Sequence, residues 1–108
     1  MSRELKDLTD VDRLIHEPAR LTIVAILSVA ERADFLFLLH ETGLTKGNLS
    51  AHLVRLEQAG YVEIEKTYRG KVPYTTCRLT SRGRAAFQAY REQMRLVVGR
   101  TGSRRRGR

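Results

Sequence analysis

Polar and basic side chains between residues 46 and 55 are the groups in this sequence whose types and spacing could do chemistry. Leu49, Leu53 and Leu56 recur at helical spacing, which predicts a helix that turns these leucines towards a core. An outward arginine suits a two-point hydrogen bond to guanine and an outward asparagine suits one to adenine, while small residues permit close approach to a groove. The candidate base-reading residues are Lys46, Gly47, Asn48, Ser50, Ala51 and Arg55.

Other chemistry has weaker support in the sequence. His16, His40 and His52 do not follow the His-Glu-x-x-His spacing of a metal site, and a structural role is expected for them. His52 flanks the core face of the same helix, so a phosphate or base contact is its competing role. Ser50 lacks the glycine pattern of a nucleophile elbow, there is no glycine-rich phosphate loop, and Cys77 is the single cysteine. We therefore expect no enzyme, no metal site and no cofactor.

Four helices are predicted upstream of the first strand. Leu8, Val11 and Ile15 indicate a short amphipathic helix that ends near His16, and Pro18 opens a second that runs to about Ala30. Asp34 is a good N-cap for a third helix over 35–41, which Gly43 terminates. Thr45 caps the fourth, which stops at Gly60, and Thr45 is counted with the DNA-contacting set. The third and fourth helices and their tight turn predict a helix-turn-helix.

After residue 60 the apolar period changes from helical to alternating. Val62 and Ile64 alternate with glutamates, Cys77 and Leu79 alternate with polar residues, and residues 68–73 between them carry turn signals. These features predict a β-hairpin whose tip carries Arg69 and Lys71 as candidate DNA contacts. Thr80 or Ser81 caps a last helix of about 17 residues that Gly99 ends. The predicted class is mainly α with a small β-hairpin.

The positive charge is unevenly distributed along the chain. The formal net charge is +8, yet residues 1–44 carry five basic and eight acidic side chains, and the excess of Lys and Arg lies downstream. Such a field attracts polyanions, nucleic acid first and anionic membrane surface second. No apolar run approaches the length of a membrane helix and the first residues lack a signal-peptide pattern, so we expect a cytoplasmic protein and no membrane partner.

Several strings in the chain resemble one known family. They are HEPARL over 16–21, LTKGNLSAHL over 44–53, LEQAGYV over 56–62 and LTSRGR over 79–84. Residues 10–98 thereby resemble winged helix-turn-helix transcriptional regulators of the MarR and ArsR type. The resemblance implies an α-α-α-α-β-wing-β-α fold, dimerisation through terminal helices and binding to promoter operators. By position it also implies wing contacts from Arg69 and Lys71, and base contacts from Lys46, Gly47, Asn48, Ser50, Ala51 and His52. The cysteine pair of metal-sensing ArsR relatives is absent.

The two end helices carry more apolar surface than one small core uses. The expected dimer interface consists of Leu8, Val11, Ile15, Tyr90, Met94 and Val97. The alternative is that the last helix folds back on its own core. We expect one domain over 1–98, including the dimerisation helices, followed by a disordered basic tail over 99–108.

The resulting prediction is a sequence-specific regulator that binds double-stranded DNA as a homodimer. Two alternatives stay open, namely a winged-helix module that binds protein or RNA, and a non-specific nucleoid-type DNA binder held by the arginine tail. A protein-binding version needs an apolar outer face on the fourth helix, where only Val54 is large and apolar. The sequence leaves open the operator, the direction of regulation, a small-molecule effector and a redox role for Cys77.

Overall fold

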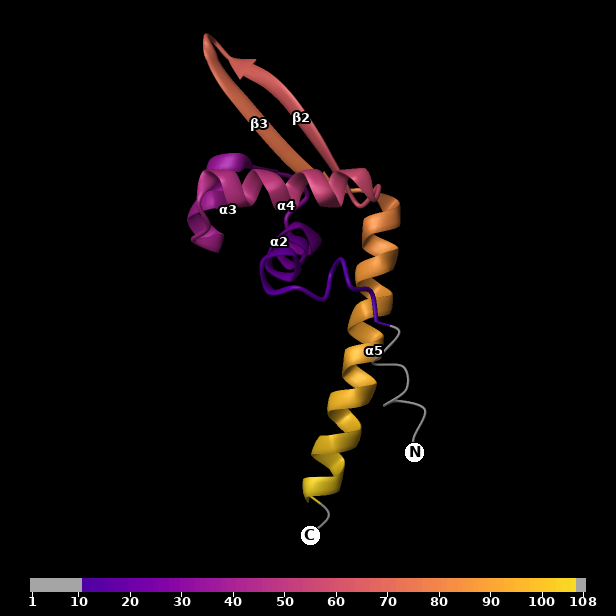
Figure 1. Cartoon of the computed structure of the whole chain (residues 1–108). Helices are drawn as coiled ribbons and strands as arrows, with labels where there is room; N and C mark the ends of the chain where they lie inside the picture. The colour runs from indigo at the N-terminus through magenta and orange to yellow at the C-terminus, as the bar shows by residue number, and fades with distance from the viewer. Residues whose placement is uncertain (1–10, 107–108) are drawn as a thin grey trace.

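A computed structural model describes residues 11–106 of the chain, with side chains up to residue 99. Four helices and a three-stranded antiparallel sheet make up this part of the chain (Figure 1). The elements are α2 (Pro18–Val29), β1 (Ala33–Asp34), α3 (Phe35–Thr42), α4 (Lys46–Gln58), β2 (Val62–Arg69), β3 (Val72–Leu79) and α5 (Ser81–Arg106). The predicted mainly α class with a hairpin between the last two helices is confirmed.

The first predicted helix is wrong over residues 11–17, which form a turn. The Asp12 side chain accepts hydrogen bonds from the backbone N–H groups of Leu14 and Ile15, at 2.9 and 3.2 Å. An aspartate that satisfies the following amides in this way favours a turn over a helix. The turn still buries Val11 and Ile15, which is why their spacing resembled a helix face. Leu8 lies outside the described residues.

The start of α2 and both ends of α3 lie where the sequence predicted them. Pro18 occupies the first turn of α2, and Glu17 is its N-cap. Asp34 caps α3 by accepting from the Phe37 N–H at 2.8 Å, and Gly43 ends that helix at φ 70°, where a side chain is disfavoured. These confirmed caps fix the short connection between α3 and α4.

The core lies where α2, α3 and α4 meet one face of the sheet. Leu49 and Leu56 of α4 are fully buried, as are Leu27 of α2 and Leu38 of α3, and Leu53 is nearly so. Burying a leucine contributes about 1.5–3 kcal/mol relative to leaving it in water. The predicted leucine stripe of α4 is therefore confirmed, and it fixes which side of α4 faces outward.

The hairpin is longer than its alternation suggested. β2 and β3 pair from Val62 with Leu79 up to Arg69 with Val72, so the connection is the two residues Gly70 and Lys71. Gly70 has φ 63°, which suits glycine at a tight hairpin turn. β1 pairs with β3 on the opposite edge, giving the order β1-β3-β2. Figure 1 shows the hairpin projecting from the helical layer as a wing.

The last helix, α5, runs to Arg106 and passes the predicted end at Gly99. A glycine costs a helix about 1 kcal/mol but does not break it when helix-forming residues flank it and no proline follows. Figure 1 shows α5 leaving the domain, and the molecule measures 62 × 24 × 23 Å along its principal axes. The assignment of 99–108 to a separate basic tail stays a prediction.

Candidate nucleic-acid interface

The face of α4 opposite its leucines is polar and exposed. Thr45 caps the helix, because its hydroxyl accepts from the Asn48 N–H at 3.1 Å. The other predicted base-reading residues are exposed along the same helix: Lys46, Gly47, Asn48, Ser50, Ala51 and Arg55. A Cβ added at Gly47 would meet nothing within 4 Å, so its outer side is open. Val54, which was not among the candidates, is also exposed on α4.

His52 occupies a different side of α4. Its side chain is 21% exposed, and its Nδ1 lies 3.1 Å from the Arg20 guanidinium and 4.0 Å from the Glu17 carboxylate. Because a guanidinium only donates, His52 Nδ1 is the acceptor in this contact. The ring therefore faces the start of α2, and a DNA contact by His52 stays a prediction.

Arg20 is a buried cation that joins three segments. Its side chain is one of two buried polar side chains among the described residues, and its Nε donates to the Leu14 carbonyl at 2.6 Å. A buried guanidinium needs such acceptors because desolvation penalises an unsatisfied charge. Arg20 thereby ties the N-terminal turn to α2 and, through His52, to α4. The sequence reasoning missed this residue because an arginine in an amphipathic helix is usually solvated.

Two tyrosines bind the same turn to the rest of the domain. The Tyr61 hydroxyl donates to Asp12, and the Tyr90 hydroxyl lies 2.8 Å from His16 Nδ1. Burial, followed by the hydrogen bond to Asp12, raises the pKa of Tyr61 to about 12. Tyr61 lies just after α4 and Tyr90 belongs to α5. The turn is therefore held both to the C-terminal end of α4 and to α5.

The tip of the wing carries the two predicted basic residues. The Arg69 guanidinium lies 4.0 Å from the centroid of the Tyr74 ring and donates to the Tyr74 hydroxyl at 3.0 Å. Such stacking holds an arginine in one orientation while leaving its charge in solvent. Lys71 is exposed in the turn itself. The wing therefore presents two cations at its far end, of which Arg69 is oriented by Tyr74.

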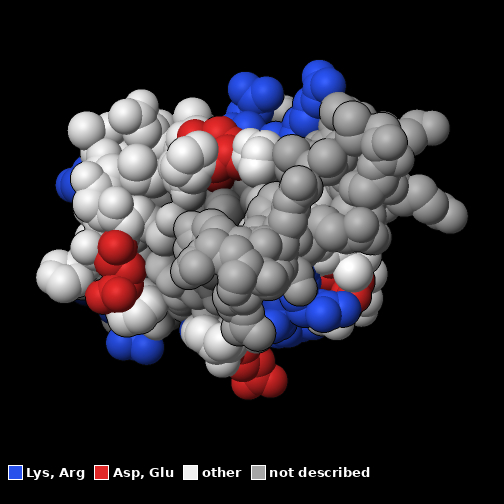
Figure 2. Space-filling view, turned by 90° about the horizontal axis from the view of Figure 1, so that it is seen from below, with Lys and Arg blue, Asp and Glu red and all other residues white. Residues whose placement is uncertain are grey.

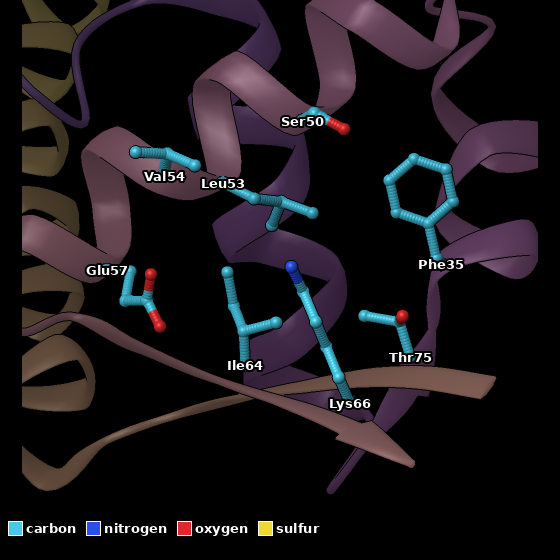
Figure 3. Close-up of a pocket in the computed structure, with 8 residues that line it drawn as sticks. All are labelled: Phe35, Ser50, Leu53, Val54, Glu57, Ile64, Lys66 and Thr75. Carbon is cyan, nitrogen blue, oxygen red and sulfur yellow. The ribbon is translucent and has the colours of Figure 1, made fainter. Parts of the chain in front are cut away.

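A groove of about 590 Å³ separates α4 from the wing. Figure 3 shows the Lys66 side chain rising from β2 towards α4, between Ile64 and Thr75. The groove is lined by Phe35, Ser50, Leu53, Val54, Glu57, Ile64, Lys66 and Thr75. Lys66 was not among the predicted contacts, although its place in the alternation after Val62 and Ile64 could have assigned it to the face that meets α4.

Basic side chains lie on the face from which α5 leaves (Figure 2) and on the elements that project from the opposite side. Figure 2 shows the side from which α5 leaves, and there Lys and Arg side chains alternate with Asp and Glu side chains and uncharged ones. On α4 and the hairpin, five exposed side chains are basic and three are acidic: Lys46, Arg55, Lys66, Arg69 and Lys71, and Glu57, Glu63 and Glu65. The charge predicted downstream of residue 44 thus includes both elements that project from the domain.

Other chemical features of the described residues are sparse. No group of three or more His, Cys, Asp or Glu side chains in this part of the chain could hold a metal ion. Burial raises the pKa of Cys77 to about 11, which keeps the thiol protonated near neutral pH. Between residues 11 and 106, no helix is both long and apolar enough to cross a membrane.

Most of the expected interface residues are buried within the single chain. Val11, Ile15 and Tyr90 are buried in the core of the single chain, and Met94 packs against that core. Val97 is also buried. The exposed apolar side chains near the end of α5 are instead Leu96 and Val98. The first part of α5 therefore packs against its own domain before the helix leaves it (Figure 1), and the dimer interface stays a prediction.

Comparison with known proteins gives the family. A model described as a winged helix DNA-binding domain matches residues 19–98. An uncharacterised protein of Methanocaldococcus jannaschii is 37% identical over 79 residues, which cover 72% of this chain and 85% of that protein. A transcriptional regulator homologue from Pyrococcus horikoshii OT3 is similar with a TM-score of 0.82 at 26% identity, covering 91% of this chain and 96% of that one.

The fold alone extends this similarity to a MarR family regulator from Enterococcus faecalis V583. Its TM-score is 0.75 at 18% identity, with 99% of this chain and 94% of that chain covered. The arrangement of α3, α4 and the wing is therefore the one that these regulators share. The chain belongs to the winged helix DNA-binding domain family, and its fold is that of DNA-binding transcriptional regulators.

Proposed function

We propose that this protein binds a two-fold symmetric operator in double-stranded DNA as a homodimer and thereby regulates transcription. In this proposal α4 lies in the major groove and the tip of the wing reaches the neighbouring minor groove. The observation that carries it is the outer face of α4, which three buried leucines hold outward and which presents polar, basic and small side chains. That composition suits a groove floor edged by phosphates.

The contacts divide into those that read sequence and those that position the protein. Asn48 and Arg55 are exposed on α4 and are suited to adenine and guanine edges. Lys71 at the wing tip is suited to phosphate, which every sequence presents alike. A dimer doubles the short recognition helix, so half-sites should lie about 10 base pairs apart or at a multiple of that spacing.

The test starts with selection of the purified protein on random duplexes. Asn48→Ala and Arg55→Ala should each lose about 1–3 kcal/mol of discrimination between the selected operator and random DNA, because each removes a two-point base contact. Lys71→Ala should weaken binding to both duplexes equally. Titrations followed by fluorescence anisotropy measure both constants. Equal losses on both duplexes for all three variants would overturn the division between reading and positioning.

The same experiment separates the two alternatives. A nucleoid-type binder would show affinity for DNA without any enriched sequence. A module for protein or RNA would show no duplex binding at physiological salt. Either outcome would reject sequence-specific regulation, while enrichment of a symmetric site supports it.

A further inference from the structure

The groove between α4 and the wing has the geometry of a seat for the DNA backbone. One strand of sugar and phosphate separates the major groove from the adjacent minor groove in a duplex. If α4 enters the first and the wing enters the second, that strand must pass between them. The space between them in this protein is the groove of about 590 Å³ that Figure 3 shows, open to solvent along α4 and β2.

The charges on the hairpin are sorted by face. Side chains alternate along a strand, so Ile64 and Lys66 face α4 while the two glutamates of β2 face the opposite side. Each of those glutamates is paired there, Glu63 with Arg78 at 2.6 Å and Glu65 with Arg32 at 3.1 Å. The acidic charge of β2 is thus directed and neutralised away from the groove.

Lys66 is the cation that this sorting leaves in the groove. Its side chain is exposed, and no salt bridge joins it to a carboxylate within the described residues. Glu57, the acidic residue of the groove, comes from the last turns of α4 at its other end (Figure 3). The groove's other lining side chains are uncharged, so the solvated lysine ammonium suits a phosphate oxygen.

The walls match the remaining chemistry of a backbone. Ile64 and Phe35, which are only partly buried, offer apolar contact to deoxyribose carbons, and the hydroxyls of Ser50 and Thr75 offer hydrogen bonds to phosphate oxygens. By alternation Tyr68 continues the Lys66 side of β2 towards the tip, and it is 69% exposed. Along β2 towards the tip, the face of the wing that meets α4 therefore carries in turn the apolar Ile64, the basic Lys66 and the aromatic Tyr68.

We propose that one strand of the duplex backbone lies in the groove between α4 and the wing, and that Lys66 Nζ pairs there with a phosphate. This inference rests on the proposed function, because it names the part of the DNA that this region contacts. Lys66 anchors the protein on any sequence and fixes how deeply α4 and the wing enter their grooves. It carries no sequence information itself.

The first test measures how the affinity of the full-length protein depends on salt. Each phosphate contact contributes about 0.9 to the negative slope of log affinity against log salt concentration. Lys66→Gln, which keeps much of the side-chain length without the charge, should lower the slope by about 0.9 per subunit on operator and random duplexes alike. Lys66→Arg should retain the slope. Arg78→Gln, which removes the same charge from the other face of the hairpin, is the matched control and should leave the slope unchanged.

The second test locates the phosphate. A series of operator duplexes, each with one neutral methylphosphonate, should show one backbone position per half-site, between the α4 and wing contacts, at which the wild type loses affinity. Lys66→Gln should lose nothing further at that position, whereas Arg78→Gln should lose as much as the wild type. Thermal melting of each variant checks that the fold is intact.

The outcomes distinguish this inference from the proposed function. If the wild type binds no duplex, both fail. If the wild type binds its operator and Lys66→Gln keeps the full slope and the full methylphosphonate sensitivity, only the seat for the backbone is overturned. Loss of slope together with loss of that sensitivity supports it.

Discussion

At the scale of single residues, specific hydrogen bonds from polar side chains hold the N-terminal turn against α4 and the segment just after it. Arg20 is buried between the Leu14 carbonyl and His52, and Asp12 holds both its own turn and the Tyr61 hydroxyl. These contacts connect the N-terminal turn to the helix proposed to enter DNA. Their energetic weight is testable because each depends on one side chain.

Replacing Arg20 by methionine should destabilise the protein. Arg20→Met keeps the apolar stem but leaves the partly buried Leu14 carbonyl without its donor, and loss of a donor to a buried acceptor costs about 1–3 kcal/mol. Urea denaturation should therefore show a lower free energy of unfolding by that amount. Arg13→Met is the control, because Arg13 is exposed. Equal midpoints for the two variants would remove Arg20 from the supporting contacts.

Tyr61 should make stability sensitive to alkaline pH. Burial and the hydrogen bond to Asp12 raise its pKa to about 12 in the folded state, from about 10 in the unfolded chain. Between these values the unfolded state releases the proton more readily, so stability is complete below about pH 10 and falls as the pH rises towards 12. Tyr61→Phe should show a shallower fall in melting temperature over that range. A parallel fall in both proteins would contradict the prediction.

At the scale of elements, two glycines of α5 have opposite structural roles. Gly83 lies in the first turn, where an added Cβ would sit 2.2 Å from the Tyr61 carbonyl oxygen and 3.0 Å from Leu79. Gly99 lies later in the same helix, and an added Cβ there would meet nothing within 4 Å. The close approach at Gly83 lets α5 begin directly against the connection between α4 and β2.

Alanine substitutions at these two positions should change stability in opposite directions. Alanine is favoured over glycine in a helix by about 1 kcal/mol, so Gly99→Ala should be neutral or raise the melting temperature. Gly83→Ala gains the same propensity, but its methyl group collides with backbone that cannot move freely, so it should lower the melting temperature. Calorimetry on both variants provides the comparison. A Gly83→Ala protein as stable as the wild type would show that the start of α5 can shift.

Sequence patterns predicted most of these elements, and the failures have physical causes. The caps Asp34, Gly43 and Thr45 act on backbone groups a few residues away, so the sequence alone is enough to predict them. The two-residue β1 is too short to show a period and exists only because Ala33 pairs with Cys77 across the sheet. Apolar spacing predicts a helix at residues 11–17 because it does not reveal the hydrogen bonds that the Asp12 side chain accepts from the following backbone N–H groups.

The candidate site shows the same contrast. The leucine stripe of α4 predicts which of its residues face outward, because helical periodicity is intrinsic to that segment. It could not show that His52 meets Arg20, since that contact joins residues 32 positions apart. The alternation that starts at Val62 does place Lys66 on the apolar face of the hairpin, but only the packing of distant elements shows that α4 covers that face.

At the scale of the whole molecule, the length of α5 exceeds what packing against a single domain requires. Its 26 residues span about 39 Å at 1.5 Å per residue, and Figure 1 shows the lower part extending past the rest of the fold. Near the domain, Tyr90 is buried and Met94 packs against the core. Further along, Leu96 is 40% exposed and Val98 is 60% exposed. Apolar side chains on a projecting helix favour a contact with a second copy.

A charge at Leu96 should therefore separate the proposed dimer without unfolding the domain. Leu96→Glu places a carboxylate on the projecting part of α5, where burial against a partner would desolvate it. We expect a monomer in sedimentation velocity, with an unchanged far-ultraviolet circular dichroism spectrum and much weaker operator binding, because only one α4 then contacts the DNA. Shortening the chain after residue 88 is a poorer test, since it removes the buried Tyr90.

Val29→Glu is the matched control for this dimer prediction. Val29 is the most exposed of the large apolar side chains described, at 87%, and it lies at the end of α2. The same apolar-to-acidic change there should leave both sedimentation and operator binding as in the wild type. If Leu96→Glu sediments as a dimer, or if Val29→Glu becomes the monomer instead, the two copies meet through a surface other than the end of α5. The spacing of the half-sites would then follow from that other surface.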